Sequence, residues 1–215
     1  VTGTVAACQG VITHEFLHSV GLPDLYRRSG TDGTPVGVWD IMASNSFFMQ
    51  YPLSYQRYKL GWIPMQQITR SGTYTLDPVS DPDSDTILYE IKTPMSASES
   101  FMLEYRKKIT TNFSNLGFET KIPSSGLLIY RVNKSVVNQT NAWGDDYLYV
   151  YRPGETSTTA SAGDLFKSAL DPNSNRTSFG VADFEASLTD GTMFYSNGKN
   201  SGIVISDVKY NNDSS

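Results

Sequence analysis

The spacing of apolar residues changes along the chain and divides it into two parts. From about Thr4 to Val20, apolar residues recur at helical intervals, which predicts a helix. The small residues Ala6 and Ala7 are typical of close packing, so we expect this helix to be mostly buried. Gly21 and Pro23 predict its end, because Gly adopts the left-handed conformation cheaply and Pro disfavours helix at the residue before it.

A second, shorter helix is predicted within 52–62, where Leu53, Arg57 and Leu60 lie at helical spacing before Gly61. From Ile68 onward the pattern consists of short runs of β-branched and aromatic residues bounded by Gly, Pro, Asn and Asp. The predicted strands are 72–79, 85–92, 100–107, 126–133, 147–153 and 202–210.

The run 126–133 alternates with a period of two, so one set of side chains should face the core. The inward set is either Leu127, Ile129 and Arg131 or Leu128, Tyr130 and Val132. We favour the second set because it is more uniformly apolar. The predicted fold class is α+β, with a β-rich region of mostly antiparallel strands after the helical part.

Composition narrows the possible partners. The 215 residues are enough for one domain or two tightly joined subdomains. The formal net charge is −5 with Lys and Arg scattered, which argues against a nucleic-acid track or a basic membrane face. No apolar run is long enough to be a transmembrane segment. The lone Cys8 cannot form an internal disulfide, and we interpret it as a small buried thiol rather than as a zinc ligand.

The stretch HEFLHSVGLPD, residues 14–24, carries the candidate chemistry. Two histidines four positions apart lie on one face of a helix, so His14 and His18 can bind one ion. The turn after Gly21 directs Asp24 back toward that ion as a third ligand, and Asp32 is the less favoured alternative. Glu15 lies beside the first ligand, where its carboxylate can act as general base toward a metal-bound water.

The alternative is that HExxH occurs by chance on a surface helix, as the bare pattern often does. The chain has only two histidines and both are in the motif. The residues between and after them include Phe16, Leu17 and Val20, which we take as the apolar positions of a buried helix. A metal site is therefore the favoured interpretation.

HEFLHSVGLPDLY followed by WDIMAS resembles the immune inhibitor A family of secreted bacterial metallopeptidases, which are metzincin-like zinc proteases with an HExxHxxGxxD signature. Later segments are similar to that family's peptidase domain in the same order: QRYKLGWI, FMLEYRKK, SGLLIYRVN, YVYRPG, AGDLF and SNGKNSGIVISDV. The zinc motif is highly specific, whereas each later segment is informative only through its order.

The resemblance implies a zinc endopeptidase that cleaves protein or peptide substrates, with His14, His18 and Asp24 as ligands. It implies that residues 1–66 are the C-terminal part of the catalytic domain, with the active-site helix and a Met-turn at Met42, and that 67–215 continue the peptidase domain. It further implies an N-terminal subdomain absent from this chain, and a secreted bacterial protein. The rival interpretation is an inactive fragment, or a module that binds protein or glycan and is stapled by zinc.

Several other residues are candidates for a structural or functional role. Asp40 is expected to fix its turn by accepting backbone amides, or to contact a ligand histidine. Three phenols are weak candidates for stabilising an oxyanion, although core packing is favoured for each: Tyr51, Tyr55 and Tyr58. The loop with Asp77, Asp81, Asp83 and Asp85 is a candidate Ca²⁺ site, although a solvated turn is favoured. A solvated position is also expected for Arg27, Arg28, Asp145 and Asp146.

Overall fold

The computed structural model describes residues 2–28, 33–45, 49–109, 118–155, 163–180 and 193–211, with the backbone alone for 2–8. The two α-helices are α1 (Thr2–Ser19) and α2 (Ser54–Lys59), so both predicted helices are confirmed. Short 3-10 turns are η1 (Gly37–Trp39), η2 (Val137–Gln139), η3 (Leu165–Lys167) and η4 (Pro172–Ser174). Among the described residues, no helix has both the length and the apolar character needed to cross a membrane.

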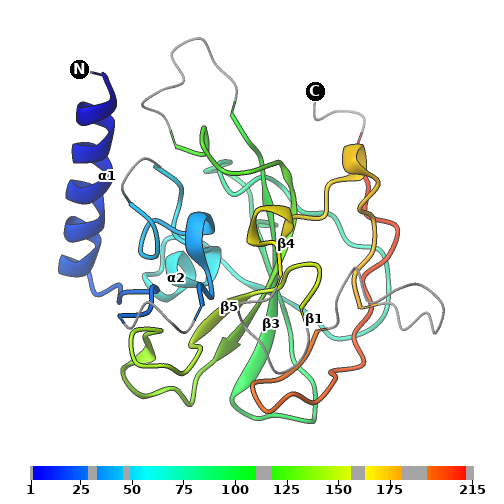
Figure 1. Ribbon diagram of the computed structural model, residues 1–215. Helices are drawn as coiled ribbons and strands as arrows, with labels where there is room; N and C mark the ends of the chain where they lie inside the picture. The colour runs from blue at the N-terminus through cyan, green and yellow to red at the C-terminus, as the bar shows by residue number, and fades with distance from the viewer. Residues whose placement is uncertain are drawn as a thin grey trace.

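A five-stranded sheet in the order β1-β2-β3-β4-β5 forms the centre of the molecule (Figure 1). Its strands are β1 (Gln66–Ile68), β2 (Leu88–Ile91), β3 (Glu99–Arg106), β4 (Gly126–Asn133) and β5 (Leu148–Val150). Only β1 and β2 are parallel, and the other three pairs are antiparallel. The α+β class and the mostly antiparallel sheet are therefore as predicted.

Two of the six predicted strands do not form. Residues 72–79 contribute one bridge, from Pro78 to Tyr105, and 202–210 contribute one bridge, from Ile205 to Phe179. Residues 72–75 are exposed, so their alternating pattern has no face to bury. Conversely, β1 was missed because its sequence QQI offers no apolar alternation.

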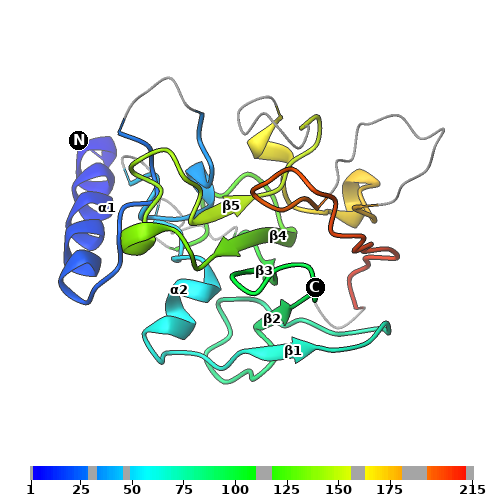
Figure 2. The same ribbon diagram turned by 90° about the horizontal axis from the view of Figure 1, so that it is seen from below.

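Both faces of the sheet are buried, and this resolves the orientation of β4. Leu128, Tyr130 and Val132 join the core shared with α1 and the turn after it, as favoured. The opposite set is also buried, because Ile129 and its neighbours pack under the C-terminal segments around Phe194. Figure 2 shows α1 and α2 on one side of the sheet and the C-terminal segments on the other. A strand covered on both sides has no solvent face, so the alternation could not show which set faces α1.

Helix α1 differs from its prediction in burial. Gly10, His14 and Leu17 are buried on one face, but Ile12 is 68% exposed and Phe16 is 61% exposed. Val11 and Val20 are exposed as well. The expectation of a mostly buried helix is therefore wrong for the described side chains. Figures 1 and 2 show why, because α1 stands at the edge of the molecule and the rest of the chain lies to one side of it.

A buried ionic cluster ties the sheet to the segments near α2. Arg106, which is fully buried on β3, donates to carboxylates of Glu104 and Glu119, and its Nη1 also donates to the Trp39 carbonyl at 2.8 Å. The second oxygen of Glu104 accepts from the Ser54 amide at 2.7 Å. Burial alone would lower the pKa of Arg106, but the carboxylates of Glu119 and Glu104 raise it above its usual value. Each charge in the cluster is thus compensated by neighbours from other segments.

We expect Glu119→Gln to lower the free energy of unfolding by about 3 kcal/mol, because removing one charge of a buried, hydrogen-bonded group leaves its partner undercompensated. The matched control is Lys167→Ala, which breaks an exposed ion pair with Asp164 and should cost less than about 1 kcal/mol. Urea unfolding of the two variants measures the difference. Equal losses would contradict the importance assigned to the Arg106 cluster.

Candidate metal centre

The two histidines of α1 and Asp24 form a compact group. His14 Nε2 and His18 Nε2 are 3.1 Å apart, and Asp24 Oδ1 lies 3.4 Å from the first and 3.1 Å from the second. It is the one group of three or more His, Cys, Asp or Glu side chains of metal-binding geometry among the described residues. The spacing of the sequence motif therefore produces the convergence it predicts.

Backbone carbonyls fix the orientation of both imidazoles. His14 Nδ1 lies 2.9 Å from the Ile41 carbonyl oxygen, and His18 Nδ1 lies 2.7 Å from the Leu22 carbonyl oxygen. A carbonyl can only accept, so each Nδ1 carries a proton, and in the neutral imidazole this tautomer leaves a lone pair on Nε2. Two such lone pairs facing each other at 3.1 Å repel unless a cation or a proton lies between them.

Asp24 is placed by the turn that ends α1. Gly21 adopts φ +100°, and the amides of Gly21 and Leu22 donate to the carbonyls of His18 and Leu17, which closes the helix as expected. The chain then reverses and brings Asp24 beneath the histidines. Its Oδ1 atom is buried without a hydrogen-bond donor, whereas Oδ2 lies 3.5 Å from Arg28 Nη2.

These residues fit a zinc ion. Ligand atoms at ordinary zinc distances in a tetrahedral site are about 3.3 Å apart. The three observed separations are 3.1, 3.4 and 3.1 Å. The unsatisfied Asp24 oxygen and the bare nitrogens of His14 and His18 are the donors that such an ion requires. The half-buried His18 leaves one side of the group open to solvent.

The turn after η1 supports the group from below. Asp40 is fully buried and accepts from the amides of Met42 and Leu53, both at 2.7 Å, so it fixes the turn by bonding amides, as predicted. Burial raises the pKa of Asp40 to about 7, although the two amides pull it down. The turn presents the Ile41 carbonyl to His14, so Asp40 acts on the histidine through the backbone. Met42 is fully buried in the same turn.

Glu15 lies on the exposed side of α1, next to the first histidine. Tyr26, which the sequence analysis did not single out, stacks on His14 with ring centroids 6.4 Å apart. Burial and the neighbouring Asp24 raise the pKa of the Tyr26 phenol, and Glu15 adds to the effect. A phenol and a free carboxylate thus lie on the solvent side of the group. The sequence signal for Tyr26 was its position two residues after Asp24.

The three phenols considered for oxyanion stabilisation make their ring contacts elsewhere. Tyr51 stacks on Phe118, and Tyr55 packs against Tyr58 and Tyr147. Tyr55 is buried in the core, where packing was the favoured role.

Two expectations of solvated charges are wrong. Arg27 is nearly buried and donates to the Gly144 carbonyl and to Asp146. Asp146 is correspondingly withdrawn from solvent, and burial raises its pKa although Arg27 and Arg131 oppose the shift. The partners are 119 residues apart in sequence, so no local pattern could reveal them. Arg28, by contrast, is exposed as expected.

Other candidates gain no support as metal ligands. Asp32 lies outside the described residues, and the side chain of Cys8 is not described. In the acidic loop, Asp77 accepts from the hydroxyls of Ser84 and Thr86, which lower its pKa. The amide of Asp83 donates to Asp81. The carboxylates of Asp77 and Asp81 therefore bond within their own turn, and the acidic residues of this loop do not form a metal-sized group.

Comparisons with known proteins agree with the resemblance found in the sequence. Residues 3–53 match the family described as the immune inhibitor A peptidase M6, catalytic domain. Pre-pro-metalloprotease PrtV from two strains of Vibrio cholerae serotype O1, M66-2 and El Tor Inaba N16961, is 26% identical over 213 residues. These alignments cover 86% of this chain and 23% of each relative. No solved structure matches significantly.

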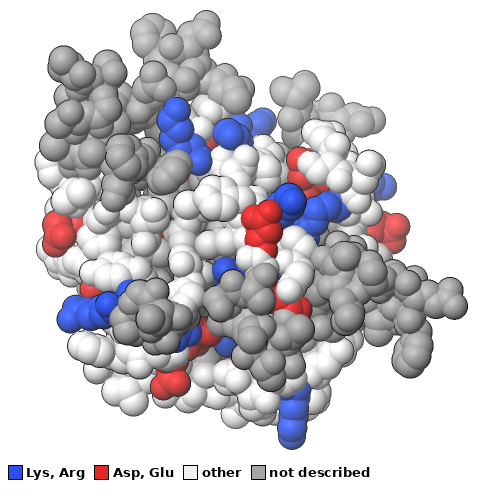
Figure 3. All heavy atoms as spheres, in the orientation of Figure 1, with Lys and Arg blue, Asp and Glu red and all other residues white. Residues whose placement is uncertain are grey.

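The resemblance to the immune inhibitor A family is thereby confirmed, and the matched range contains both histidines, Glu15 and Asp24. The chain spans about a quarter of the length of the curated relatives it matches. Basic side chains are scattered among acidic and uncharged ones on the face in Figure 3, in line with the charge pattern of the sequence.

We expect the protein to bind about one Zn²⁺ per chain in equilibrium dialysis. His14→Ala and His18→Ala should each abolish tight binding, and Asp24→Ala should weaken it, because each removes one donor of the group. Asp32→Ala is the matched control and should bind as the unaltered protein does. Loss of binding in Asp32→Ala with retention in Asp24→Ala would reassign the third ligand.

Proposed function

We propose that this chain, which is similar to immune inhibitor A peptidases, carries the zinc-binding part of a secreted bacterial metalloendopeptidase that hydrolyses peptide bonds in proteins. The observation that carries the proposal is the convergence of two bare imidazole nitrogens and an unsatisfied carboxylate oxygen at tetrahedral separations. The family match and the metalloprotease relative support the same class of reaction.

His14, His18 and Asp24 would hold the ion. Zinc bound there would supply the Lewis acidity that acidifies water and polarises the scissile carbonyl. Glu15, which is exposed beside the group, accepts the proton of the attacking water and returns it to the leaving nitrogen. The Asp24 carboxylate cancels one of the two positive charges of the ion, so more of the proton transfer depends on Glu15 than at a site of three histidines.

We further propose that the turn carrying Met42 is the Met-turn of a metzincin-like site. Its burial, its bond to Asp40 and the Leu25 amide that donates to the Met42 carbonyl at 2.9 Å support this assignment. Residues 1–66 and 67–215 would then be consecutive parts of one peptidase domain. Their shared core supports this, because Leu17 and Met42 from the first part pack with Tyr130 and Leu148 from the second.

The rival function is a binding module in which zinc only staples the fold. Closed structural zinc sites use four protein ligands. The described residues provide three, with an exposed glutamate next to the first. An open site with a base beside it favours hydrolysis over a structural role.

The exposed side of α1 supports the proposal that a unit outside this chain packs against this helix. Ile12, Phe16 and Val20 lie four residues apart, so they form one apolar stripe, with Val11 beside it. A contiguous apolar stripe next to a metal group is typical of a surface that packs against another unit. We propose that the N-terminal subdomain covers this stripe and forms the upper wall of the substrate cleft.

We expect Glu15→Ala to keep its zinc and its fold while losing about 10²–10⁴-fold in turnover of a protein substrate, because only proton transfer is removed. The assay uses an active, upstream-extended form of the protein at equal zinc occupancy. Asp83→Ala, which removes another exposed carboxylate, is the control and should keep full activity. Retained activity in Glu15→Ala would refute the general base.

We also expect this chain alone to cleave casein poorly compared with a version extended upstream in its own gene. Without the cleft wall, the substrate loses positioning that is worth up to about 7–11 kcal/mol in well-oriented reactions. Phe16→Ser should change the stability of this chain by less than about 0.5 kcal/mol but destabilise the extended protein by more, since only there is the side chain covered. Equal cleavage rates and equal stability changes would show that no upstream unit covers α1.

A further inference from the structure

A segment far along the chain holds the loop that carries the third ligand. Residues 140–146, which connect η2 to β5, lie against residues 24–28, and the two are separated by more than a hundred positions in sequence. We call residues 140–146 the clamp segment. The family match ends at residue 53, so the clamp segment lies outside it.

The contacts of the clamp segment concentrate on the backbone of Asp24 and its neighbour. Thr140 Oγ1 donates to the Asp24 carbonyl at 2.6 Å, and the Asn141 amide donates to the same oxygen at 3.3 Å. Asn141 Nδ2 donates to the Leu25 carbonyl at 3.1 Å. Two consecutive peptide groups at the third ligand are thus held by three donors.

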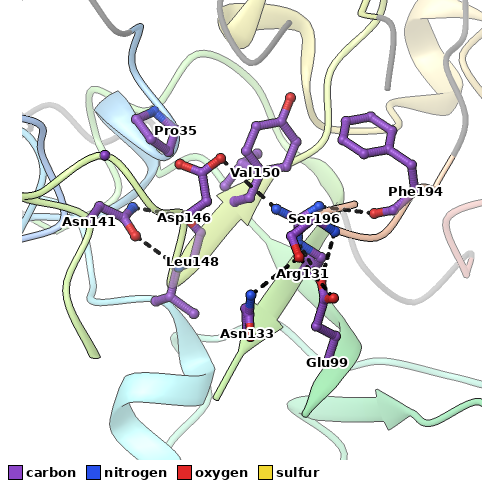
Figure 4. A network of polar contacts seen from close by, with 12 residues as sticks. Pro35, Glu99, Arg131, Asn133, Asn141, Asp146, Leu148, Val150, Phe194 and Ser196 are labelled. Atoms are coloured by element: carbon purple, nitrogen blue, oxygen red, sulfur yellow. Dashed lines mark hydrogen bonds and ion pairs between the residues drawn. The ribbon is translucent and has the colours of Figure 1, made fainter. Parts of the chain in front are cut away.

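Asn141 is in turn anchored to the sheet. Its Oδ1 accepts from the Leu148 amide at 3.0 Å, and its Nδ2 donates to the Leu148 carbonyl at 2.8 Å (Figure 4). Asn141 is fully buried, so water cannot replace these partners. Because Leu148 begins β5, Asn141 connects the backbone of Asp24 to the central sheet.

A second anchor lies at the other end of the clamp segment. Asp146 pairs with Arg27 of residues 24–28, which we call the ligand loop, and lies 3.9 Å from Arg131 of β4. Arg131 in turn lies 3.2 Å from Glu99 of β3, as Figure 4 shows. This row of alternating charges runs from the ligand loop into the sheet, and its members are mostly buried.

We propose that Thr140 and Asn141 are positioning residues of the metal centre, which set the place of the Asp24 carboxylate relative to His14 and His18. The inference rests on the proposed function, because it assumes that these three side chains bind the ion. The histidines are fixed by α1 and by carbonyls, so the third ligand is the part of the group that depends on a loop. Zinc–ligand distances tolerate only a few tenths of an ångström, so a small shift of this loop weakens binding.

The test compares the same substitution, Thr→Val, at Thr140 and at a control position. Thr140→Val removes the hydroxyl that donates to Asp24 and should lower zinc affinity about tenfold in a chelator competition, while Thr140→Ser should stay within about twofold. Thr86→Val is the matched control, because the Thr86 hydroxyl also donates to an aspartate, Asp77, in a different loop. It should leave zinc affinity unchanged at a comparable loss of metal-free thermal stability.

The outcomes separate the two proposals. If the unaltered chain binds zinc and Thr140→Val binds equally well, the positioning role is overturned while the metal site stands. If the unaltered chain binds no zinc, the proposed function fails and this inference fails with it. Altered absorption of the Co²⁺-loaded Thr140→Val protein would support a displaced ligand, which a purely structural role would not produce.

A measurement on the unaltered protein covers the case in which Thr140→Val does not fold. Coupling between sites is reciprocal, so zinc bound at Asp24 must stabilise the contacts that position Asp24. We expect zinc to slow hydrogen exchange of the Asn141 amide at least about tenfold. The Asp77 amide, which donates to the Thr86 carbonyl in a distant turn, should be unaffected. An unchanged rate at Asn141 would overturn the proposal.

Discussion

The arrangement of two bare imidazole nitrogens 3.1 Å apart is the constraint on which the candidate site depends. Neither ring can turn away, because the carbonyls of Ile41 and Leu22 hold the opposite nitrogens. The fold therefore keeps two lone pairs facing each other, with the unsatisfied oxygen of Asp24 beside them. A cation bound among these three atoms would offset the repulsion of the two lone pairs and satisfy the carboxylate oxygen.

Segments near to and far from α1 in the sequence each contribute to that arrangement. The turn at Gly21 reverses the chain locally, and Asp40 holds the turn that presents the Ile41 carbonyl. From the sheet, Arg106 donates to the carbonyl of Trp39, one residue before Asp40. The β-rich part thus supports the metal group through buried polar contacts as well as through the shared core.

The sequence was informative where the governing interactions are local. Helical spacing predicted that His14 and His18 converge, and the turn at Gly21 follows from its conformational freedom. It was misleading for Phe16, because an apolar residue favours burial without requiring it, and this side chain lies on the exposed side of α1. Asn141 could not be recognised, because its role depends on contacts with Leu25 that are 116 positions away. Non-local contacts of this kind leave no periodicity to detect.

The central claim is that two imidazoles and a carboxylate bind zinc, and X-ray absorption at the zinc edge of the loaded protein tests it most directly. The account predicts nitrogen and oxygen ligands only, at about 2.0–2.2 Å, with the outer-shell scattering of two imidazoles. The expected ligands are His14, His18 and Asp24, so Asp24→Ala, which should still bind zinc more weakly, should keep the scattering of both imidazoles. A sulfur ligand at about 2.3 Å, which Cys8 would provide, or a spectrum without imidazole scattering would contradict the account.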